Sequence, residues 1–366
     1  MNEDISLPTD LQKSPKEYFQ VALDTIKKVA GTCITPDNES QILIELGKML
    51  ELAGHLEKAL EEYSKALAIS ETDTVRAEAL KRIGNTMSKR TEWSKALESY
   101  EASLALLEKI GNASETGHIF NSIGFNHFEN GNFAKAKEFY DKALEIAEKY
   151  DSKQLLADVH NNIGALMSAN EQEVDAIDHY QQSIDIYKTI CDNHGLAQTY
   201  HNLAMLYANI GALGISGEYY QKSMEICIEI EDLNLLSVIY INRANLALKI
   251  HDIYMAKSYC SKAHLIFEKT DNKMGLAEVY KICGIIYTRT QEWVYANEMF
   301  QKGIQLCEDF GNYLTKAEIH YEMGMSLLKH ENKESALQHL QEAINIYEYL
   351  GIGREVERIK NEVSAA

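Results

Sequence analysis

Small residues recur at a fixed spacing along most of this chain, and this period is the feature that most limits its possible folds. Successive members lie 37 residues apart once and then 40 residues apart six times. The positions are Gly47, Gly84, Gly124, Gly164, Ala204, Ala244, Gly284 and Gly324. A period of this length is typical of repeat proteins, in which each repeat is one supersecondary unit. We therefore expect an array of similar units along the chain.

Three further positions in each repeat keep a constant size. Twelve residues after the first small residue stands a second small one, four residues later a large one, and three residues later a third small one. The large set is Tyr63, Tyr100, Tyr140, Tyr180, Tyr220, Cys260, Phe300 and Leu340. Facing small residues allow two helix backbones to approach closely, and a large side chain one turn further on fills the wedge that opens beside them. The pattern predicts antiparallel helix pairs that stack on one another.

Helix breakers are confined to the N-terminal end. All three prolines, Pro8, Pro15 and Pro36, lie in the first 36 of the 366 residues. Proline removes a backbone donor and disrupts a helix interior, so its absence elsewhere favours helix throughout. Turn sequences such as Asn209-Ile210-Gly211 separate the paired small positions. Two short turns in each repeat leave roughly 16 residues, or about 24 Å, for each helix.

This order of small, small, large and small residues resembles the tetratricopeptide repeat, here in eight copies. The resemblance implies an all-α, right-handed superhelical solenoid of helix–turn–helix repeats. The 40-residue length, without the usual closing proline, is similar to the repeats of kinesin light chain, Pins-type adaptors and bacterial Rap-type regulators. Ala204, Ala244 and Ser216 replace the usual small residues in the fifth and sixth repeats. We expect these repeats to be slightly looser than the others.

The repeats suggest three segments. Residues 1–36 are expected to hold an N-terminal tail and a capping helix, in which Phe19, Ala22 and Leu23 resemble the second half of a repeat. Residues 37–350 hold the eight repeats. Residues 351–366 are expected to form a C-terminal capping helix that exposes a charged face to solvent.

Charge and motif content narrow the function classes. The chain has 36 basic and 55 acidic side chains, and the net charge of −19 opposes binding to nucleic acid. No apolar run reaches the roughly 20 residues of a membrane span, and the acidic, polar start lacks an export signal, so we expect a cytoplasmic protein. The six cysteines form no CxxC pair and are interpreted as reduced core thiols. No HExxH, phosphate-loop, GxSxG or GxGxxG motif occurs, so we expect no catalytic residue, metal or cofactor.

Polar side chains gather on one face of the first helix of the predicted repeats. In a stack of this kind the first helices line the concave surface, and positions −3, −2 and +1, counted from the first small residue, share that face. Position −2 holds Asn162, Asn202 and Asn242 in three successive repeats. Position −3 holds Lys81, Asn121, Asn161, His201 and Lys281, and position +1 holds Asn85, Phe125, Met205 and Asn245. Phe128 and Tyr321 are added as candidates for side-chain pockets on the same surface.

The asparagine row admits two interpretations. Asparagine offers donors and an acceptor, so a row of amides can pair with the backbone of an extended peptide. The resemblance to kinesin light chain and Pins-type repeats implies such a peptide-binding ladder at Asn162, Asn202 and Asn242. Alternatively, the same amides satisfy polar groups at the seams between helices and specify their packing.

Together these features predict a non-catalytic protein–protein interaction scaffold or adaptor that binds an extended peptide segment of a partner in a concave groove. One alternative is a Rap-type regulator, in which a bound peptide switches the binding of a second protein. Such regulators carry an N-terminal three-helix bundle, for which 36 residues before the first repeat leave little room. Another alternative is self-assembly into a homo-oligomer. The identity of the partner is not contained in the sequence.

Overall fold

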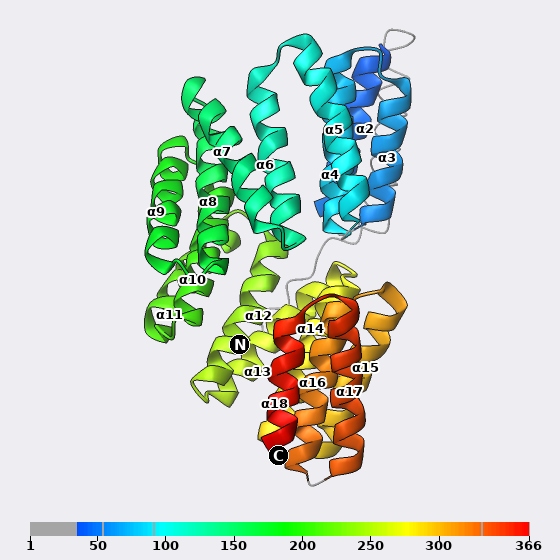
Figure 1. The fold of residues 1–366 in the computed structure, drawn as a ribbon, viewed down its shortest axis with the longest axis vertical. Coiled ribbons are helices and arrows are strands. Elements are labelled where there is room, and N and C mark those ends of the chain that lie inside the picture. The colour runs from blue at the N-terminus through cyan, green and yellow to red at the C-terminus, as the bar shows by residue number, and fades with distance from the viewer. Residues whose placement is uncertain (1–34, 53–54, 91, 331, 366) are drawn as a thin grey trace, which may run out of the picture. The chain divides into compact units, whose positions relative to one another are not determined.

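The computed structural model describes residues 35–52, 55–90, 92–330 and 332–365, and among these residues the regular structure is entirely α-helical (Figure 1). The first helices of the repeats are α2 (Pro36–Leu52), α4 (Asp73–Lys89), α6 (Ala113–Glu129), α8 (Lys153–Ala169), α10 (Asn193–Asn209), α12 (Leu233–Lys249), α14 (Lys273–Arg289) and α16 (Tyr313–Lys329). The second helices are α3 (Leu56–Ile69), α5 (Trp93–Ile110), α7 (Phe133–Lys149), α9 (Glu173–Ile190), α11 (Leu213–Glu229), α13 (Ile253–Lys269), α15 (Trp293–Phe310) and α17 (Lys333–Tyr349). A last helix, α18 (Gly353–Ala365), follows. The predicted N-terminal capping helix lies outside the described residues.

Side chains that cap the helix N-termini explain where many helices begin. Asn112 accepts the backbone N–H of Glu115 at 3.2 Å, and Asp232 accepts that of Leu235 at 3.0 Å. These bonds satisfy one of the donors that the first turn of a helix leaves unpaired. The same arrangement is made by Thr72, Asn132, Asp252, Asn272, Asn312 and Asn332.

Many turns between helices use a left-handed residue at one of two repeat positions, 7 or 27 residues after the first small residue. Glycine takes this conformation at Gly111, Gly131, Gly211, Gly311 and Gly351. Other residues take it at the same two positions of other turns, with φ between 48° and 62°. These residues are Asp151, Glu171, Cys191, Glu231, His251, Asp271 and Gln291. Cys191 is exposed at the end of α9, which corrects the interpretation of all cysteines as core thiols.

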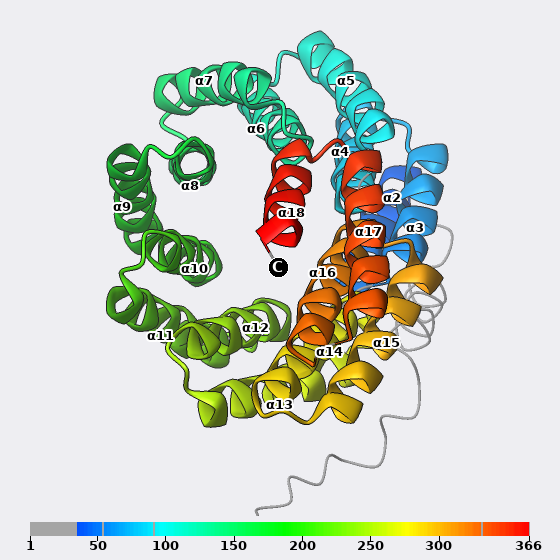
Figure 2. The same ribbon diagram turned by 60° about the horizontal axis from the view of Figure 1, so that its bottom comes forward.

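The chain divides into two compact units, one up to Gly195 and the other from Leu196 onward, and we describe each by itself. In the first unit, α2, α4, α6 and α8 contact one another in that order, and each pairs with its following helix (Figures 1 and 2). In the second unit, α12, α14 and α16 contact one another in the same way, and α18 packs against α17. None of the described helices is both long and apolar enough to span a bilayer.

The predicted wedge is confirmed in the first unit. A Cβ atom placed on Gly124 would lie 2.6 Å from the Tyr140 ring, and one on Gly164 would lie 2.8 Å from the Tyr180 ring. The wedge tyrosines are buried, and the second small residues are fully buried. Only glycine leaves room for an aromatic ring this close to the helix backbone.

The second unit keeps this arrangement with different residues. Ala204 and Ala244 are fully buried at the position that glycine occupies elsewhere. Ser216, one of the departures expected to loosen the fifth repeat, is fully buried, and its Oγ donates to the Ala204 carbonyl at 2.8 Å. The buried Ser216 hydroxyl is therefore satisfied by a hydrogen bond within the core.

A second ring contact joins the two helices of several repeats. Its members lie four residues before and fifteen residues after the first small residue, and we call them the seam pair. The aromatic seam pairs are Phe120–Phe139, Tyr200–Tyr219 and Tyr240–Tyr259, with ring centroids 5.9–6.0 Å apart. The histidine seam pairs are His160–His179 and His320–His339, with centroids 5.2 and 5.1 Å apart.

Candidate functional site

In the first unit, the predicted amides brace neighbouring first helices. Asn162 Nδ2 on α8 donates to Asn121 Oδ1 on α6 at 2.9 Å. Asn85 Oδ1 on α4 accepts the hydroxyl of the wedge residue Tyr100 at 2.8 Å. All three amides are half-buried, as is Asn161. The amides therefore have a packing role, and each keeps part of its surface on this face of the unit.

The two phenylalanines predicted for this face differ in exposure. Phe125 on α6 is 40% exposed. Phe128, one turn further along α6, is half-buried, and its ring lies 5.7 Å from the ring of Phe133 on α7. Phe125 is therefore the more accessible apolar surface.

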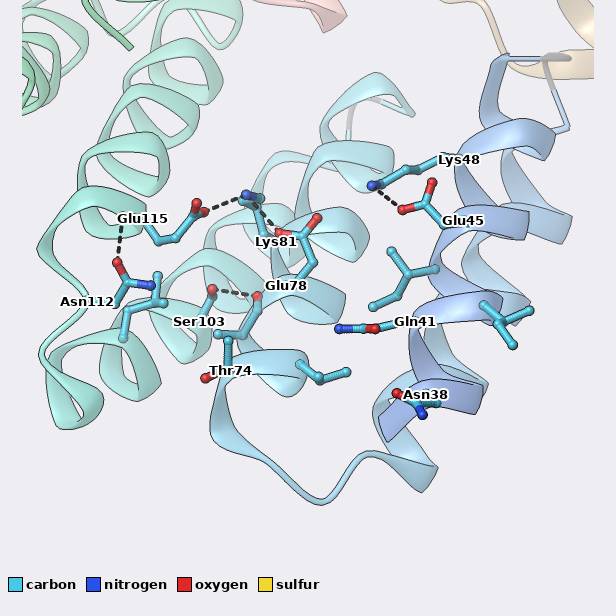
Figure 3. Close-up of a pocket in the computed structure, with 15 residues that line it drawn as sticks. Asn38, Gln41, Glu45, Lys48, Thr74, Glu78, Lys81, Ser103, Asn112 and Glu115 are labelled. Carbon is cyan, nitrogen blue, oxygen red and sulfur yellow. Dashed lines mark hydrogen bonds and ion pairs between the residues drawn. The ribbon is translucent and has the colours of Figure 1, made fainter. Parts of the chain in front are cut away.

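A pocket of the first unit lies near the N-termini of α2, α4 and α6 (Figure 3). It has a volume of about 890 Å³ and an apolar floor that includes Ile44, Val75 and Leu107. Of the predicted site residues in this unit, Lys81 alone lines it. The structure thus separates Lys81 from the asparagines that were predicted beside it.

Lys81 is held by two carboxylates. Its Nζ lies 2.8 Å from Glu78 and 2.9 Å from Glu115 (Figure 3). Burial acts to raise the pKa of Glu78, but Lys81 and Arg82 outweigh this effect and the pKa is lowered. Lys81 therefore links α4 to α6 through its ion pair with Glu115. Because two carboxylates already neutralise its charge, Lys81 would not present a free positive charge to a ligand.

In the second unit, predicted and unpredicted residues meet in one groove. The groove has a volume of about 380 Å³ and is formed by residues of α10, α11, α12, α14 and α16. Met205, Asn242 and Asn245, which were predicted as neighbours, line it together. Met205 is 41% exposed, and both asparagines are half-buried. The groove combines an apolar contact from Met205 on α10 with two amides from α12.

Three charged residues of this groove were missed by the prediction. Arg289 Nη1 donates to the Leu248 carbonyl at 2.5 Å, and Lys249 Nζ donates to the Ala208 carbonyl at 3.4 Å. Cations are favoured at these carbonyls because they belong to the C-terminal ends of helices. A basic residue recurs five positions after the first small residue in four repeats, and this pattern could have identified Lys249 and Arg289. It occurs at Lys89, Lys249, Arg289 and Lys329.

Glu322, the third missed residue, occupies the −2 position in which other repeats hold asparagine. Burial raises the pKa of its carboxyl, while Lys281 and other nearby cations oppose the shift. This carboxyl lines both the 380 Å³ groove and a second pocket of about 370 Å³.

His201 does not line the groove as predicted. It is 3% exposed, and burial lowers its pKa to about 4. Its Nε2 lies 3.3 Å from Asn242 Nδ2, so the neutral ring accepts from that amide and supports it from beneath. Asn202 lies outside the groove, and its Oδ1 accepts from Gln198 at 3.1 Å. The −3 position faces inward in this repeat because the side chain packs edge-on against the wedge residue Tyr220.

Lys281 and Tyr321 line the second pocket, together with residues of α17 and α18. Tyr321 donates its hydroxyl to Glu362 at 2.8 Å, and the Arg358 guanidinium lies 4.4 Å from its ring centroid. Lys281 pairs with Glu278 at 2.6 Å and also with Glu318. These two predicted residues are thus engaged by side chains of the same unit, and α18 covers the tyrosine.

Family models match two parts of the chain. Residues 115–189 match one model of the tetratricopeptide repeat, and residues 196–231 match another. The same residue pattern and the same paired helices continue on both sides of these segments. The chain therefore contains tetratricopeptide repeats and has an all-α solenoid fold. Comparison with curated proteins gives no match.

Several solved structures share the fold over most of the chain. A Rap protein complexed with competence and sporulation factor is 14% identical, with a TM-score of 0.66, over 92% of this chain and 99% of that one. The apo form of the quorum sensor NprR from B. thuringiensis is 13% identical, with a TM-score of 0.60, over 90% and 94%. Aspartyl phosphate phosphatase F from Bacillus subtilis is 15% identical, with a TM-score of 0.60, over 94% and 96%.

Proposed function

We propose that this protein is a non-catalytic interaction module that binds an extended peptide segment of a partner in the groove of the second unit. The observation that carries the proposal is the meeting of Asn242, Asn245 and Met205 in one groove. Tetratricopeptide-repeat architecture supports a role in protein–protein interaction.

The chemistry of the groove suits a peptide backbone. Each asparagine amide can donate to a carbonyl and accept from an N–H, which an extended chain presents alternately. Asn242 and Asn245 lie three residues apart on α12, which places their side chains about 5–6 Å apart, comparable with the roughly 7 Å spanned by two extended residues. Met205 offers a flexible, polarizable contact for a side chain of the peptide. Lys249, Arg289 and Glu322 also line the groove, and their one excess positive charge favours an acidic peptide over a basic one.

Binding is expected to depend on the two amides. A library of extended peptides displayed on phage would be selected against the intact protein, and the dissociation constant of the best peptide would be measured by fluorescence anisotropy. Asn245→Ala should weaken binding about five- to tenfold, since a hydrogen bond contributes about 1 kcal/mol and its loss leaves a backbone group unpaired. Asn242→Ala should weaken binding at least as much.

The matched control is Asn345→Ala on α17, an exposed asparagine whose Oδ1 accepts from Gln341 on the same helix. This variant should bind with unchanged affinity. Because Asn242 also bonds His201, circular dichroism of each variant must show unchanged helix content. Equal affinity of the Asn242 and Asn245 variants and the wild type, with all of them folded, would refute this site.

A second candidate is a Rap-type regulator, in which a bound factor switches the binding of another protein. The breadth of the structural similarity favours it, since the match covers 99% of a Rap protein that was solved with competence and sporulation factor. Such a switch requires the two states to differ in shape. If this candidate is right, the selected peptide should change the radius of gyration measured by small-angle X-ray scattering. An unchanged scattering profile at saturating peptide would leave the static interaction module as the better description.

A further inference from the structure

Two cysteines from neighbouring repeats lie against each other in the second unit. Cys260 is on α13 and Cys283 is on the following helix, α14, and their Sγ atoms are 3.1 Å apart. Cys260 is 2% exposed, whereas Cys283 is half-buried. No short spacing motif joins them in the sequence, because the fold brings together residues that lie on different helices.

A pocket gives access to this pair. Cys260 occupies the wedge position, where the other repeats hold tyrosine, phenylalanine or leucine. A cysteine fills less of the wedge than an aromatic ring, and a pocket of about 260 Å³ lies beside it. Both cysteines line this pocket, together with Lys257, His264 and Tyr287. A small reagent can therefore approach the sulfur atoms.

The two thiols have different surroundings. The hydrogen bond from Cys260 lowers the pKa of Cys283, and the nearby Lys257 ammonium acts in the same direction. The same hydrogen bond, together with burial, raises the pKa of Cys260. Cys260 Sγ also lies 3.6 Å from the Val279 carbonyl oxygen, but a charged thiolate is the stronger acceptor. Because Cys283 is also the less buried of the two thiols, we assign it as the nucleophile of the pair and Cys260 as the proton donor.

We propose that Cys283 and Cys260 form a reactive dithiol site that is oxidised to an internal disulfide by low-molecular-weight disulfides. The Cys283 thiolate attacks one sulfur of the reagent, which forms a mixed disulfide and expels one thiolate. Cys260 then loses its proton and attacks Cys283 Sγ, which forms the protein disulfide and expels the second thiolate. The protein loses two electrons and two protons, and the reagent is reduced to two thiols.

The geometry supports the second step. The sulfur atoms must approach by about 1 Å to reach the length of a disulfide bond, about 2.05 Å. The product would join α13 to α14 covalently and so fix the seam between the sixth and seventh repeats. Arg289 of the peptide groove lies on α14, so this bond would also anchor one wall of that groove.

The other described cysteines serve as internal controls. Burial raises the pKa of Cys227 to about 12 and that of Cys307 to about 11, and both residues are buried. Cys191 is exposed, and no other cysteine shares its turn. Among the described cysteines, oxidation to an internal disulfide should therefore be confined to Cys260 and Cys283, while Cys191 should form a mixed disulfide.

The test uses the full chain and oxidised glutathione. After oxidation, free thiols would be alkylated and the protein digested without reduction. We expect a crosslinked peptide that contains Cys260 and Cys283, together with alkylated Cys227 and Cys307. Thiol titration of the native protein should show Cys283 reacting at least about tenfold faster than Cys227 and Cys307, since only thiolates attack. Recovery of Cys260 and Cys283 in alkylated form after prolonged oxidation would overturn the proposal.

Single variants separate the two roles. In Cys260→Ser, the mixed disulfide with glutathione should persist at Cys283, because the second thiol is missing. In Cys283→Ser, Cys260 should remain alkylatable. A stable adduct at Cys260 instead of Cys283 would reverse the assignment and contradict the proposed order of attack. If a variant does not fold, the peptide map of the wild-type protein still decides the proposal.

Discussion

Replacing Tyr140 by alanine is expected to lower the free energy of unfolding of the first unit by about 3–5 kcal/mol. Tyr140 is fully buried against Gly124, where the closeness of ring and backbone leaves no neighbour that could fill the space. Removing the ring loses its transfer free energy and also leaves a cavity in a closely packed wedge. A loss below 1 kcal/mol would show that the wedge ring does not hold the repeat together.

The matched control is Tyr140→Phe. The Tyr140 hydroxyl is buried and has no hydrogen-bond partner among the described residues. Its removal should therefore leave stability unchanged or increase it slightly. Tyr100→Phe should behave differently and cost about 1 kcal/mol, because the Tyr100 hydroxyl donates to Asn85 at 2.8 Å.

The two tryptophans make this measurement specific for one unit. Trp93 begins α5 in the first unit, and Trp293 begins α15 in the second. In a Trp293→Phe background, fluorescence during urea unfolding reports on the first unit through Trp93. Circular dichroism recorded in parallel gives the total loss of helix.

Acidification from about pH 7 to pH 4 is expected to destabilise both units through the histidine seam pairs. The Nδ1 atoms lie 2.9 Å apart in His160–His179 and also in His320–His339. Such a distance allows one shared proton, whereas two imidazolium rings would repel each other. Burial, followed by the partner histidine, lowers the pKa of His160 and of His320 to about 4. Burial also lowers the pKa of His179 and His339.

The direction of the pH effect follows from proton binding. Between the unfolded value of about 6.5 and the folded value of about 4, the unfolded chain binds more protons than the native one. The neutral histidine pairs therefore contribute their full stability above about pH 6.5, and this contribution is lost as the pH falls from about 6.5 to about 4. Each unit of pKa difference corresponds to about 1.4 kcal/mol before solvent screening reduces it.

Charged neighbours of the seam pairs modify the effect. Asp178 and Asp175 raise the pKa values around the first histidine pair, and Lys137 lowers that of His179. Glu308 and Glu342 raise those of the second pair, and Lys316 lowers that of His320. The lowered histidine pKa values place the steepest loss of stability between pH 6 and pH 4.5.

The residue beside each seam pair differs between the aromatic and the histidine pairs. In the aromatic seam pairs a lysine lies over the rings, at Lys142, Lys222 and Lys262. The same repeat position holds Gln182 and Glu342 where the pair is histidine. This repeat position therefore lacks a lysine in the two repeats whose paired rings can themselves become charged.

A matched variant tests the pH prediction. The double change His160→Phe and His179→Phe reproduces the Phe120–Phe139 pair of the preceding repeat. Unfolding of the first unit should then depend less steeply on pH between 7 and 4, while the second unit should be unaffected. Identical pH profiles for the variant and the wild type would show that other groups cause the acid instability.

Much of the fold could be predicted because it depends on local size patterns. Gly124 and Tyr140 are 16 residues apart, and helix geometry alone places them face to face once the turn is located. Contacts between repeats were harder to predict. Glu115 neutralises Lys81, and Glu318 neutralises Lys281, from the next first helix, so neither ion pair could be read from one repeat alone.

In the candidate site, too, the features within one helix could be predicted and the contacts between helices could not. The periodic pattern predicted that Asn242 and Asn245 share one helix face, and both residues line one groove. It did not predict that Asn162 would bond Asn121 or that His201 would turn inward. Both outcomes depend on how far neighbouring helices are rotated against each other. Tyr321 is covered by Arg358 and Glu362 of α18, which lies outside the repeat pattern.

Replacing the non-glycine left-handed turn residues by glycine should raise the thermal stability of the chain. Glu171 and His251 hold a backbone conformation that costs a side-chain-bearing residue about 1 kcal/mol, at repeat positions where Gly131 and Gly211 adopt it without strain. In a solenoid the gains at separate turns should nearly add, since each repeat touches only its neighbours. Protein engineers could therefore raise the melting temperature by editing turns alone, without touching the helix faces that carry the grooves.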